Sequence, residues 1–237
     1  MSLNLFLIYL SSYSLIPALV IGVVMYKKHL FSEPLRIVLY CVYFMALMEI
    51  LEWGIIYLYR INHVPMKDRN SHFLTNIHIF LEFYILAYAY YSLAKVKIQK
   101  TIITLFMLAE ACLLLTYDFS SWKNFNHFNS ITNSVASLLM IAILFMYFYN
   151  LLQTLETKNI LKDPWFWIST GAWFYYSGVL FAFIFSENIL FNKSESYTIL
   201  WNIYYIFIVV FRIFLAIGLW LSKTQNSLNS SSKSVLQ

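Results

Sequence analysis

The stretch LNLFLIYLSSYSLIPALVIGVVMY, residues Leu3–Tyr26, is apolar along most of its length and contains no Lys, Arg, Asp or Glu. The hydrocarbon core of a bilayer, about 30 Å thick, requires about 20 apolar residues in a helix, because lipid offers no partner to an unpaired backbone amide. The stretch therefore predicts a membrane-spanning helix. Lys27 and Lys28 follow it and no basic residue precedes it, the reverse of a secretory signal, so we expect the span to stay uncleaved.

Six further segments meet the same requirement of length and apolarity. With the first one, the predicted spans are Leu3–Tyr26, Leu35–Tyr59, Phe73–Ala94, Thr101–Tyr117, Ile131–Leu152, Trp165–Phe185 and Tyr197–Leu221. The sequence thus predicts an all-α membrane protein, a bundle of seven transmembrane helices within residues 1–222. Residues 223–237, KTQNSLNSSSKSVLQ, have the composition of a disordered tail.

The overall composition excludes several classes of function. Of the 237 residues, 61% are hydrophobic and 11% are charged, whereas soluble domains have about 45–50% apolar and about 25% charged residues. Almost no sequence remains for a soluble catalytic, kinase or DNA-binding domain. The net charge of +5 comes from short clusters between apolar runs, so no continuous basic face for nucleic acid is expected. The lipid bilayer is the predicted partner, and the composition leaves the oligomeric state open.

The basic residues predict the orientation in the membrane. With the N-terminus outside and the C-terminus inside, the inner segments hold twice as many Lys and Arg residues as the outer ones, as the positive-inside rule requires. The inner set is Lys27, Lys28, Arg36, Lys95, Lys97, Lys100, Lys158, Lys162, Lys223 and Lys233, and the outer set is Arg60, Lys67, Arg69, Lys123 and Lys193. We expect a multi-pass protein of the bacterial inner (plasma) membrane, with Trp201 among the aromatic residues at its outer interface.

Several ionisable and polar residues lie inside the predicted spans. A charge near the bilayer centre costs at least about 2.5 kcal/mol, so such a group must face a partner, a cavity or water. Counted from the inner ends of the helices at about 1.5 Å per residue, four charged groups lie near the midplane and four polar or ionisable groups lie further out. The first set is Glu49, Glu82, Glu110 and Arg212, and the second is Glu52, His78, Asn76 and Asn202.

The spacing of these residues predicts a pocket in the outer half of the bundle. Glu49 and Glu52 share one face of the second span, and His78 and Glu82 share one face of the third. If the two faces meet, they form a mostly acidic cavity with Arg212 of the seventh span as its counter-charge. The alternative is purely structural, with Arg212 pairing with Glu49 or Glu82 to fix the helix register.

The same residues are weak candidates for a metal site. His78, Glu82, Glu49 and Glu52 would offer one nitrogen and several oxygens, yet they match neither the di-iron nor the zinc-hydrolase pattern, so no metal is predicted. No cofactor is predicted either. A retinal protein requires a lysine in the middle of the seventh helix, where this chain has Arg212.

Other motifs concern helix packing and shape. Pro17 should bend the first span, because it lacks an N–H and its ring clashes with the preceding turn. Gly171 and Gly178 are seven residues apart and so lie on one face of the sixth span, which predicts a close helix contact.

The strings NIHIFLEF at 76–83 and DPWFWIS at 163–169, together with the aromatic-rich texture of most of the chain, carry a family resemblance. In them the chain resembles uncharacterised seven-span inner-membrane proteins of Bacteroidota-type bacteria. The resemblance implies the seven-helix fold and no particular activity.

Three hypotheses about function follow from these observations. The first is a sensory or receptor-like protein that binds a small ligand or ion in the outer half of the bundle and signals to a cytoplasmic partner. The second is a transporter or ion-coupled permease that uses the intramembrane Glu and Arg residues. The third is a metal-dependent or lipid-modifying membrane enzyme with His78 and the glutamates at its centre. The first is favoured, because the chain shows no internal repeat and no familiar hydrolase or nucleotide-binding motif.

Overall fold

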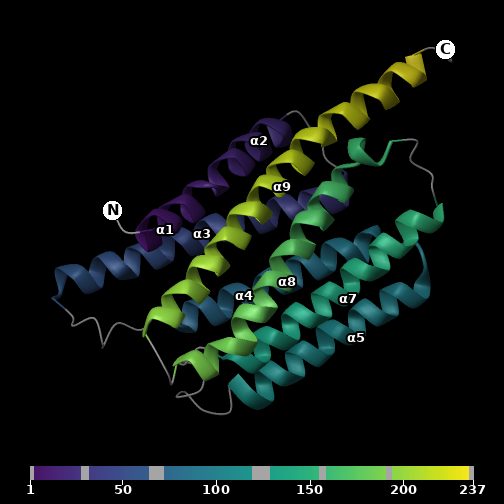
Figure 1. The fold of residues 1–237 in the computed structure, drawn as a ribbon. Helices are drawn as coiled ribbons and strands as arrows, with labels where there is room; N and C mark the ends of the chain where they lie inside the picture. The colour runs from purple at the N-terminus through teal and green to yellow at the C-terminus, as the bar shows by residue number, and fades with distance from the viewer. Residues whose placement is uncertain are drawn as a thin grey trace.

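The computed structural model shows an elongated bundle of helices with the two ends of the chain at opposite ends of the bundle (Figure 1). It describes residues 3–27, 32–63, 72–118, 129–154, 159–190 and 194–234, and these residues form helices and short connections without any strand. The helices are α1 (Leu3–Tyr13), α2 (Leu15–Lys27), α3 (Glu33–Ile61), α4 (His72–Leu93), α5 (Lys97–Leu113), α7 (Ser130–Thr154), α8 (Pro164–Leu190) and α9 (Ser194–Ser234). A π-helical turn, η2 (Leu114–Asp118), continues α5, and a 3-10 turn, η3 (Ile160–Lys162), precedes α8.

Seven segments of the described chain are long and apolar enough to cross a membrane, as the sequence predicts. Their bounds agree closely with prediction except at the fourth, which begins at Lys97 rather than at Thr101. The difference arises because Lys97 and Lys100 lie in the first turn of α5, where long basic side chains can reach water from the end of a helix. The seven segments suggest a multi-pass membrane protein.

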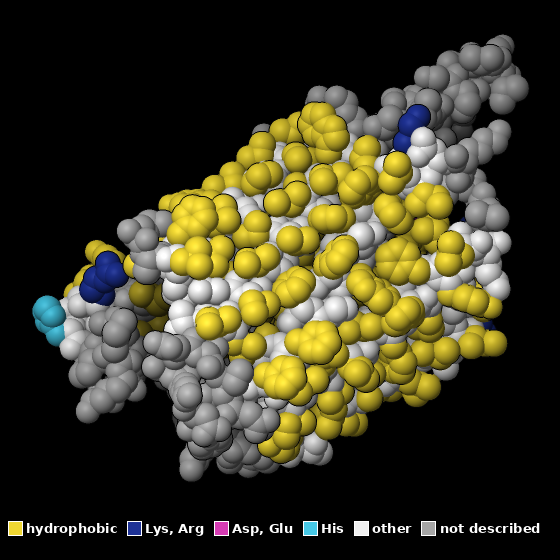
Figure 2. Space-filling model, viewed as in Figure 1, with side chains coloured by type: hydrophobic (Ala, Val, Ile, Leu, Met, Phe, Trp, Pro, Cys, Tyr) yellow, Lys and Arg dark blue, Asp and Glu magenta, His cyan; other side chains and the backbone are white. Residues whose placement is uncertain are grey.

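The outer surface of the bundle has the apolar character that such a protein needs. Large hydrophobic side chains are exposed on each of the seven segments, including Val20, Leu105, Phe145, Phe181 and Ile213. The face seen in Figure 2 is covered mostly by hydrophobic side chains. Exposed apolar patches on soluble monomers rarely exceed a few hundred Å², so this surface favours contact with lipid over contact with water.

The first of the seven apolar segments is interrupted at Ser14, between α1 and α2. Pro17 explains the break, because a proline has no N–H for the carbonyl four residues earlier and its ring collides with that carbonyl. The predicted distortion is thus present and lies one turn before the proline. The Ser14 hydroxyl donates to the Ser11 carbonyl at 2.6 Å and so satisfies a backbone group near the end of α1.

Helices α8 and α9 pack closely through glycines, as the spacing of Gly171 and Gly178 predicts. A Cβ atom added at Gly171 would come within 2.4 Å of Cβ of Phe214, and one at Gly178 within 2.2 Å of the Phe207 ring. On the other helix, a Cβ atom at Gly218 would approach Ile168 to 2.5 Å. The absence of side chains at these positions therefore sets the distance between the two helices.

The last helix extends well past its apolar segment. The apolar segment ends at Ser222, whereas α9 continues to Ser234 and protrudes from the bundle at the C-terminal end (Figure 1). Residues 223–234 of the predicted disordered tail are therefore helical, and residues 235–237 lie outside the described chain. A helix that is already formed can extend cheaply, because each added residue contributes a hydrogen bond without a new nucleation cost. At about 1.5 Å per residue, α9 is about 60 Å long.

Asp163 caps the start of α8. Its Oδ1 atom accepts a hydrogen bond from the Trp165 amide at 3.1 Å, and its Oδ2 atom accepts one from the Tyr147 hydroxyl at 3.3 Å. Pro164 occupies the first helical position, where its missing N–H costs nothing. Burial raises the pKa of the Asp163 carboxyl above its usual value, although both hydrogen bonds oppose this shift.

We expect Asp163→Ala to lower the stability of the detergent-solubilised protein by about 1 kcal/mol, because the helix loses its N-cap. Asp163→Asn should keep the cap. Since the pKa of Asp163 is raised on folding, its contribution to stability is greatest below the unfolded-state pKa and declines as pH rises through the folded-state pKa. The Asn variant should lack this decline when thermal unfolding is followed at increasing pH, and an identical pH dependence in both proteins would contradict the assignment.

Candidate functional site

A cavity of about 470 Å³ lies between α1, α3, α4 and α9, toward the end of the bundle that holds the N-terminus. This volume falls within the usual range for small-molecule sites, about 300–1,000 Å³. Its described lining combines charged, hydroxyl and aromatic side chains with a few aliphatic ones. The lining residues are Asn4, Ile8, Ser11, Ser12, Glu49, Glu52, Trp53, Ile56, Thr75, His78, Thr198, Trp201, Tyr204, Tyr205, Ile208 and Arg212.

An ion pair between α9 and α3 forms part of the cavity wall. The Arg212 guanidinium donates through one terminal nitrogen to Oε1 of Glu49 at 2.7 Å. Its other terminal nitrogen donates to the backbone carbonyl of Ser11 at 2.5 Å. The Arg212 side chain is 4% exposed and that of Glu49 is 20% exposed, so the pair is largely removed from solvent. Of the two partners that the sequence allows for Arg212, the structure brings Glu49 to it.

The Ser11 carbonyl lies near the end of α1 and accepts two hydrogen bonds, one from the Ser14 hydroxyl and one from Arg212. The last carbonyls of a helix lack intrahelical partners, and they carry the negative end of the helix dipole. The break at Ser14 places such a terminus in the middle of the first spanning segment. A cation is favoured at this position, so α1 and Glu49 together stabilise the buried charge of Arg212.

The second oxygen of Glu49 is also bonded. Ser12 donates its hydroxyl to Oε2 of Glu49 at 2.8 Å, and Trp53 donates its indole N–H to the Ser12 oxygen at 3.2 Å. The Trp53 ring stacks on Tyr9, with centroids 5.5 Å apart. Glu49 is thus held on both oxygens by groups from α1 and α9, which fixes its position at the cavity wall.

Glu52 differs from Glu49 although both line the cavity on the same face of α3. Within the described part of the chain, its carboxylate makes no hydrogen bond and no ion pair. The side chain is only partly exposed. Glu52 is therefore the one carboxylate of the described lining whose oxygens are left for a bound molecule.

His78 and Glu82 occupy different depths of the third spanning segment. His78 lines the cavity, and its ring packs edge-on against Phe44 with centroids 5.7 Å apart. Glu82 lies one turn behind it, 3% exposed and outside the lining. It accepts long hydrogen bonds from the hydroxyls of Tyr175 and Tyr176, at 3.5 Å and 3.3 Å.

The closest nitrogen–oxygen approach of His78 to Glu82 is 3.6 Å, which is too long for a hydrogen bond. Glu82 therefore contacts α8 through Tyr175 and Tyr176 and does not line the cavity, whereas the sequence predicts that it faces a ligand.

The two predicted asparagines do not line the cavity. Asn76 is buried at 2% exposure and follows the lining residue Thr75, so it points about 100° away around α4. Asn202 accepts a hydrogen bond at 3.0 Å from the side-chain amide of Asn4, which does line the cavity. Asn202 therefore belongs to the rim as a support for Asn4. Glu110, predicted near the midplane, is buried on α5, which contributes nothing to the described lining.

Sequence reasoning missed the polar residues of α1 and the aromatic wall. The polar residues of α1 are indicated by the string SSYS at 11–14, a polar run inside an apolar segment just before Pro17. For the aromatic wall, the position of Trp201 near a helix end predicts a place in an interface belt, and the structure shows that its side chain lines the cavity. It forms an aromatic cluster with Tyr204 and Tyr205, with centroid distances of 5.1–6.3 Å.

The weak metal candidates are not brought together as a metal site. Among the residues that the structure describes, no group of three or more His, Cys, Asp and Glu side chains is arranged to hold a metal ion. Glu49 is engaged by Arg212 and Ser12, and Glu82 lies behind the cavity wall.

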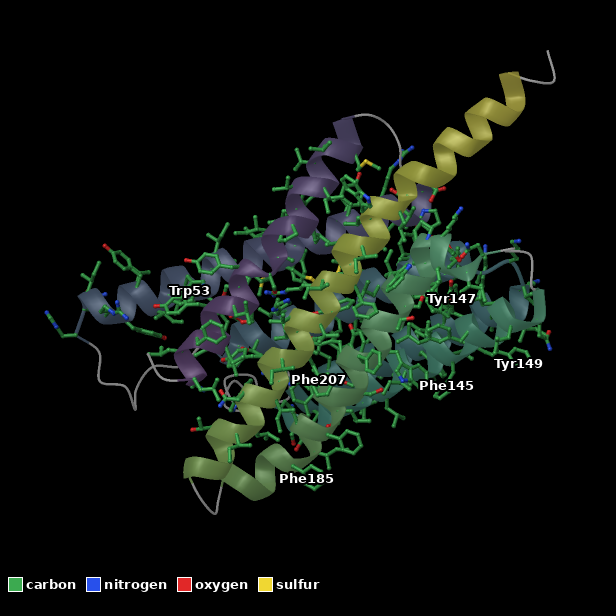
Figure 3. All side chains as sticks on the ribbon, turned by 45° about the horizontal axis from the view of Figure 1, so that its top comes forward. Trp53, Phe145, Tyr147, Tyr149, Phe185 and Phe207 are labelled. Atoms are coloured by element: carbon green, nitrogen blue, oxygen red, sulfur yellow. The ribbon has the colours of Figure 1, made fainter. Side chains whose placement is uncertain are left out.

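A second cavity, of about 440 Å³, lies at the opposite end of the bundle, near the start of α8. Figure 3 shows the separation, with Trp53 on α3 toward one end and Tyr147 on α7 toward the other. Polar side chains of the second cavity bond to each other, since Gln99 donates to Asn150 at 2.7 Å and Tyr147 donates to Asp163. The first cavity, with its charged groups and its open carboxylate, is the stronger candidate site.

Comparison with protein-family models, with curated proteins and with solved structures gave no match. The resemblance to seven-span proteins of Bacteroidota-type bacteria therefore stays a prediction.

Proposed function

We propose that this protein is a sensory or receptor-like protein of the bacterial inner (plasma) membrane that binds a small ligand in the cavity between α1, α3, α4 and α9. The observation that carries the proposal is the cavity of about 470 Å³, whose wall holds a fixed ion pair and an open carboxylate. Convergent polar groups in a largely apolar bundle are costly, and such groups usually serve binding.

The proposed orientation places this cavity on the outer side of the membrane. The cavity lies at the end with the N-terminus, and the sequence assigns ten Lys and Arg residues to the predicted inner segments against five to the outer ones. Reporter fusions at the two termini test the orientation, with the N-terminus expected outside and the C-terminus in the cytoplasm. Both termini on one side would contradict it.

Helix α9 offers a direct route from the cavity to a cytoplasmic partner. It carries Arg212, Trp201 and Tyr205 in the cavity wall and continues without interruption to Ser234, beyond the apolar segment. A ligand that shifts the Arg212–Glu49 pair would therefore move a rigid element that extends past the bundle. This continuity favours sensing over a protein that only stores or sequesters a ligand.

A transporter is the second candidate, supported by the break at Ser14. Broken helices whose termini face a charged group at mid-membrane are typical of secondary transporters, and the end of α1 faces Arg212 in this way. A proton or ion flux in proteoliposomes, lost in Glu52→Gln, would favour transport over sensing.

Ligand screening on the protein in lipid nanodiscs tests the leading proposal. We expect at least one class of small molecule to raise the thermal stability of the protein. Ile8→Trp should abolish that stabilisation, since Ile8 lines the cavity and the larger ring fills it. Phe6→Trp on the same helix is the matched control, because Phe6 is 49% exposed on the outer surface.

Signalling has its own measurement. Ligand binding should change hydrogen exchange of the backbone amides of α9 after Ser222, because the cavity wall and this end belong to one helix. If a ligand binds and exchange in this part of α9 does not change, the protein binds a ligand without signalling through α9. If no class of compound stabilises the protein, the proposed site is wrong.

A further inference from the structure

The charges that line the cavity do not cancel. The described lining contains three charged side chains, Glu49, Glu52 and Arg212, together with His78. Arg212 and Glu49 neutralise each other at 2.7 Å, and both terminal nitrogens of the guanidinium are already donating hydrogen bonds. Glu52 forms no ion pair within the described chain, and Arg212, which acts on it at longer range, is already paired with Glu49, so the described lining carries one more acidic than basic side chain and is complementary to one positive charge.

An anion would fit this site poorly. It would have to compete with Glu49 and with the Ser11 carbonyl for Arg212, the one Arg side chain of the described lining, and it would face Glu52 as a like charge. Breaking a buried ion pair by removing one partner is strongly unfavourable, and a single contact to an anion would not compensate for that loss.

The aromatic part of the lining also favours a cation. Trp53, Trp201, Tyr204 and Tyr205 all face the same cavity. The face of an aromatic ring is negative, and it attracts ammonium groups most strongly where water is excluded. An inorganic ion would leave these rings unused, whereas an organic cation can place its charge near Glu52 and its apolar part against the rings.

We propose that the cavity binds a small organic ammonium ion, with Glu52 as its counter-ion and the aromatic wall as its apolar contact. This inference rests on the proposed function and names the chemical class of its ligand. Glu49 occupies Arg212 in an ion pair at 2.7 Å, which leaves Glu52 as the carboxyl of the described lining that is not engaged in an ion pair. The volume of about 470 Å³ limits the ligand to a small molecule.

Matched probes test the charge preference directly. 2-Phenylethylammonium, 2-phenylethanol and 3-phenylpropionate have similar shapes and carry positive, zero and negative charge. In nanodiscs we expect the ammonium compound to bind at least about tenfold more tightly than the other two. Glu52→Gln should remove this preference, and Glu33→Gln, an exposed position on the same helix, should retain it. Equal or weaker binding of the ammonium compound, or no binding at millimolar concentration, overturns the proposal.

A second experiment does not depend on the choice of ligand. Ile56 lines the cavity one turn after Glu52, so Ile56→Cys places a thiol beside the carboxylate. In a Cys112→Ser background, which removes the exposed native cysteine, the thiol reacts with thiosulfonate reagents bearing either a trimethylammonium or a sulfonate group. The cation-to-anion rate ratio should fall at least about tenfold in Glu52→Gln. A ratio that is unchanged by the substitution contradicts the proposal.

The two levels of proposal fail in different ways. If compounds of any charge stabilise the protein and Ile8→Trp prevents it, but the ammonium preference is missing, the site stands and the ligand class is wrong. If no compound binds and the thiol at position 56 reacts at equal rates with both reagents, both proposals fail.

Discussion

Glu49→Gln is expected to destabilise the protein by about 3 kcal/mol, because it leaves the Arg212 guanidinium buried without a counter-charge. Arg212→Met should cost less. The carboxylate that it leaves behind is 20% exposed, and Ser12 still donates a hydrogen bond to it. The double variant should be more stable than the two separate losses would predict, because it removes both charges at once. Unfolding in detergent, followed by helical circular dichroism, measures all three.

Glu33→Gln controls for the loss of one negative charge. It makes the same chemical change on the same helix at an exposed position, in the first turn of α3, where a carboxylate contributes at most about 1 kcal/mol through the helix dipole. We expect a loss of stability well below that of Glu49→Gln. If Glu49→Gln lowers stability no more than this control does, the ion pair does not stabilise the bundle. The Arg212–Glu49 pair would then not hold the cavity wall in place.

Gly171→Ala should destabilise the protein by between about 1 and 3 kcal/mol, by forcing α8 and α9 apart. The added methyl would lie 2.4 Å from Cβ of Phe214, an atom that cannot move away without the backbone of α9. Gly178→Ala meets only the ring of Phe207, which can rotate, so we expect a smaller loss there. Thermal unfolding in the same detergent ranks the variants.

Gly54→Ala is the matched control for helix packing. No atom lies within 4 Å of the added Cβ at this position, so the substitution should leave stability unchanged or raise it slightly. Comparable losses at Gly54 and Gly171 would show that flexibility of the chain, and not the close contact between helices, is responsible.

The α8–α9 contact also bears on signalling. Because α9 carries one wall of the cavity, a wider spacing between the helices should weaken ligand binding as well as stability. Gly171→Ala is therefore expected to lower the affinity for 2-phenylethylammonium although Gly171 does not line the cavity. A variant that loses stability and keeps full affinity would show that the cavity is independent of this packing.

The sequence by itself determined seven helices long and apolar enough to cross a membrane, and the position of each ionisable residue along its helix. Apolar length and a fixed rise per residue decide both, and neither depends on neighbouring helices. It also determined the close contact at Gly171 and Gly178, because seven residues return a helix to the same face. The break before Pro17 follows from the missing backbone donor of that residue.

Only the tertiary structure decided which charges meet. Arg212 bonds to Glu49 and to the Ser11 carbonyl, residues 163 and 201 positions away in the chain, and that choice depends on how three helices rotate and cross. Packing of the helices also leaves Glu82 and Asn76 buried outside the cavity lining, whereas Trp201 is part of that lining. Periodicity gives the face on which a side chain lies, whereas the partner of that face is set by packing between helices, where small residues and side-chain shape dominate.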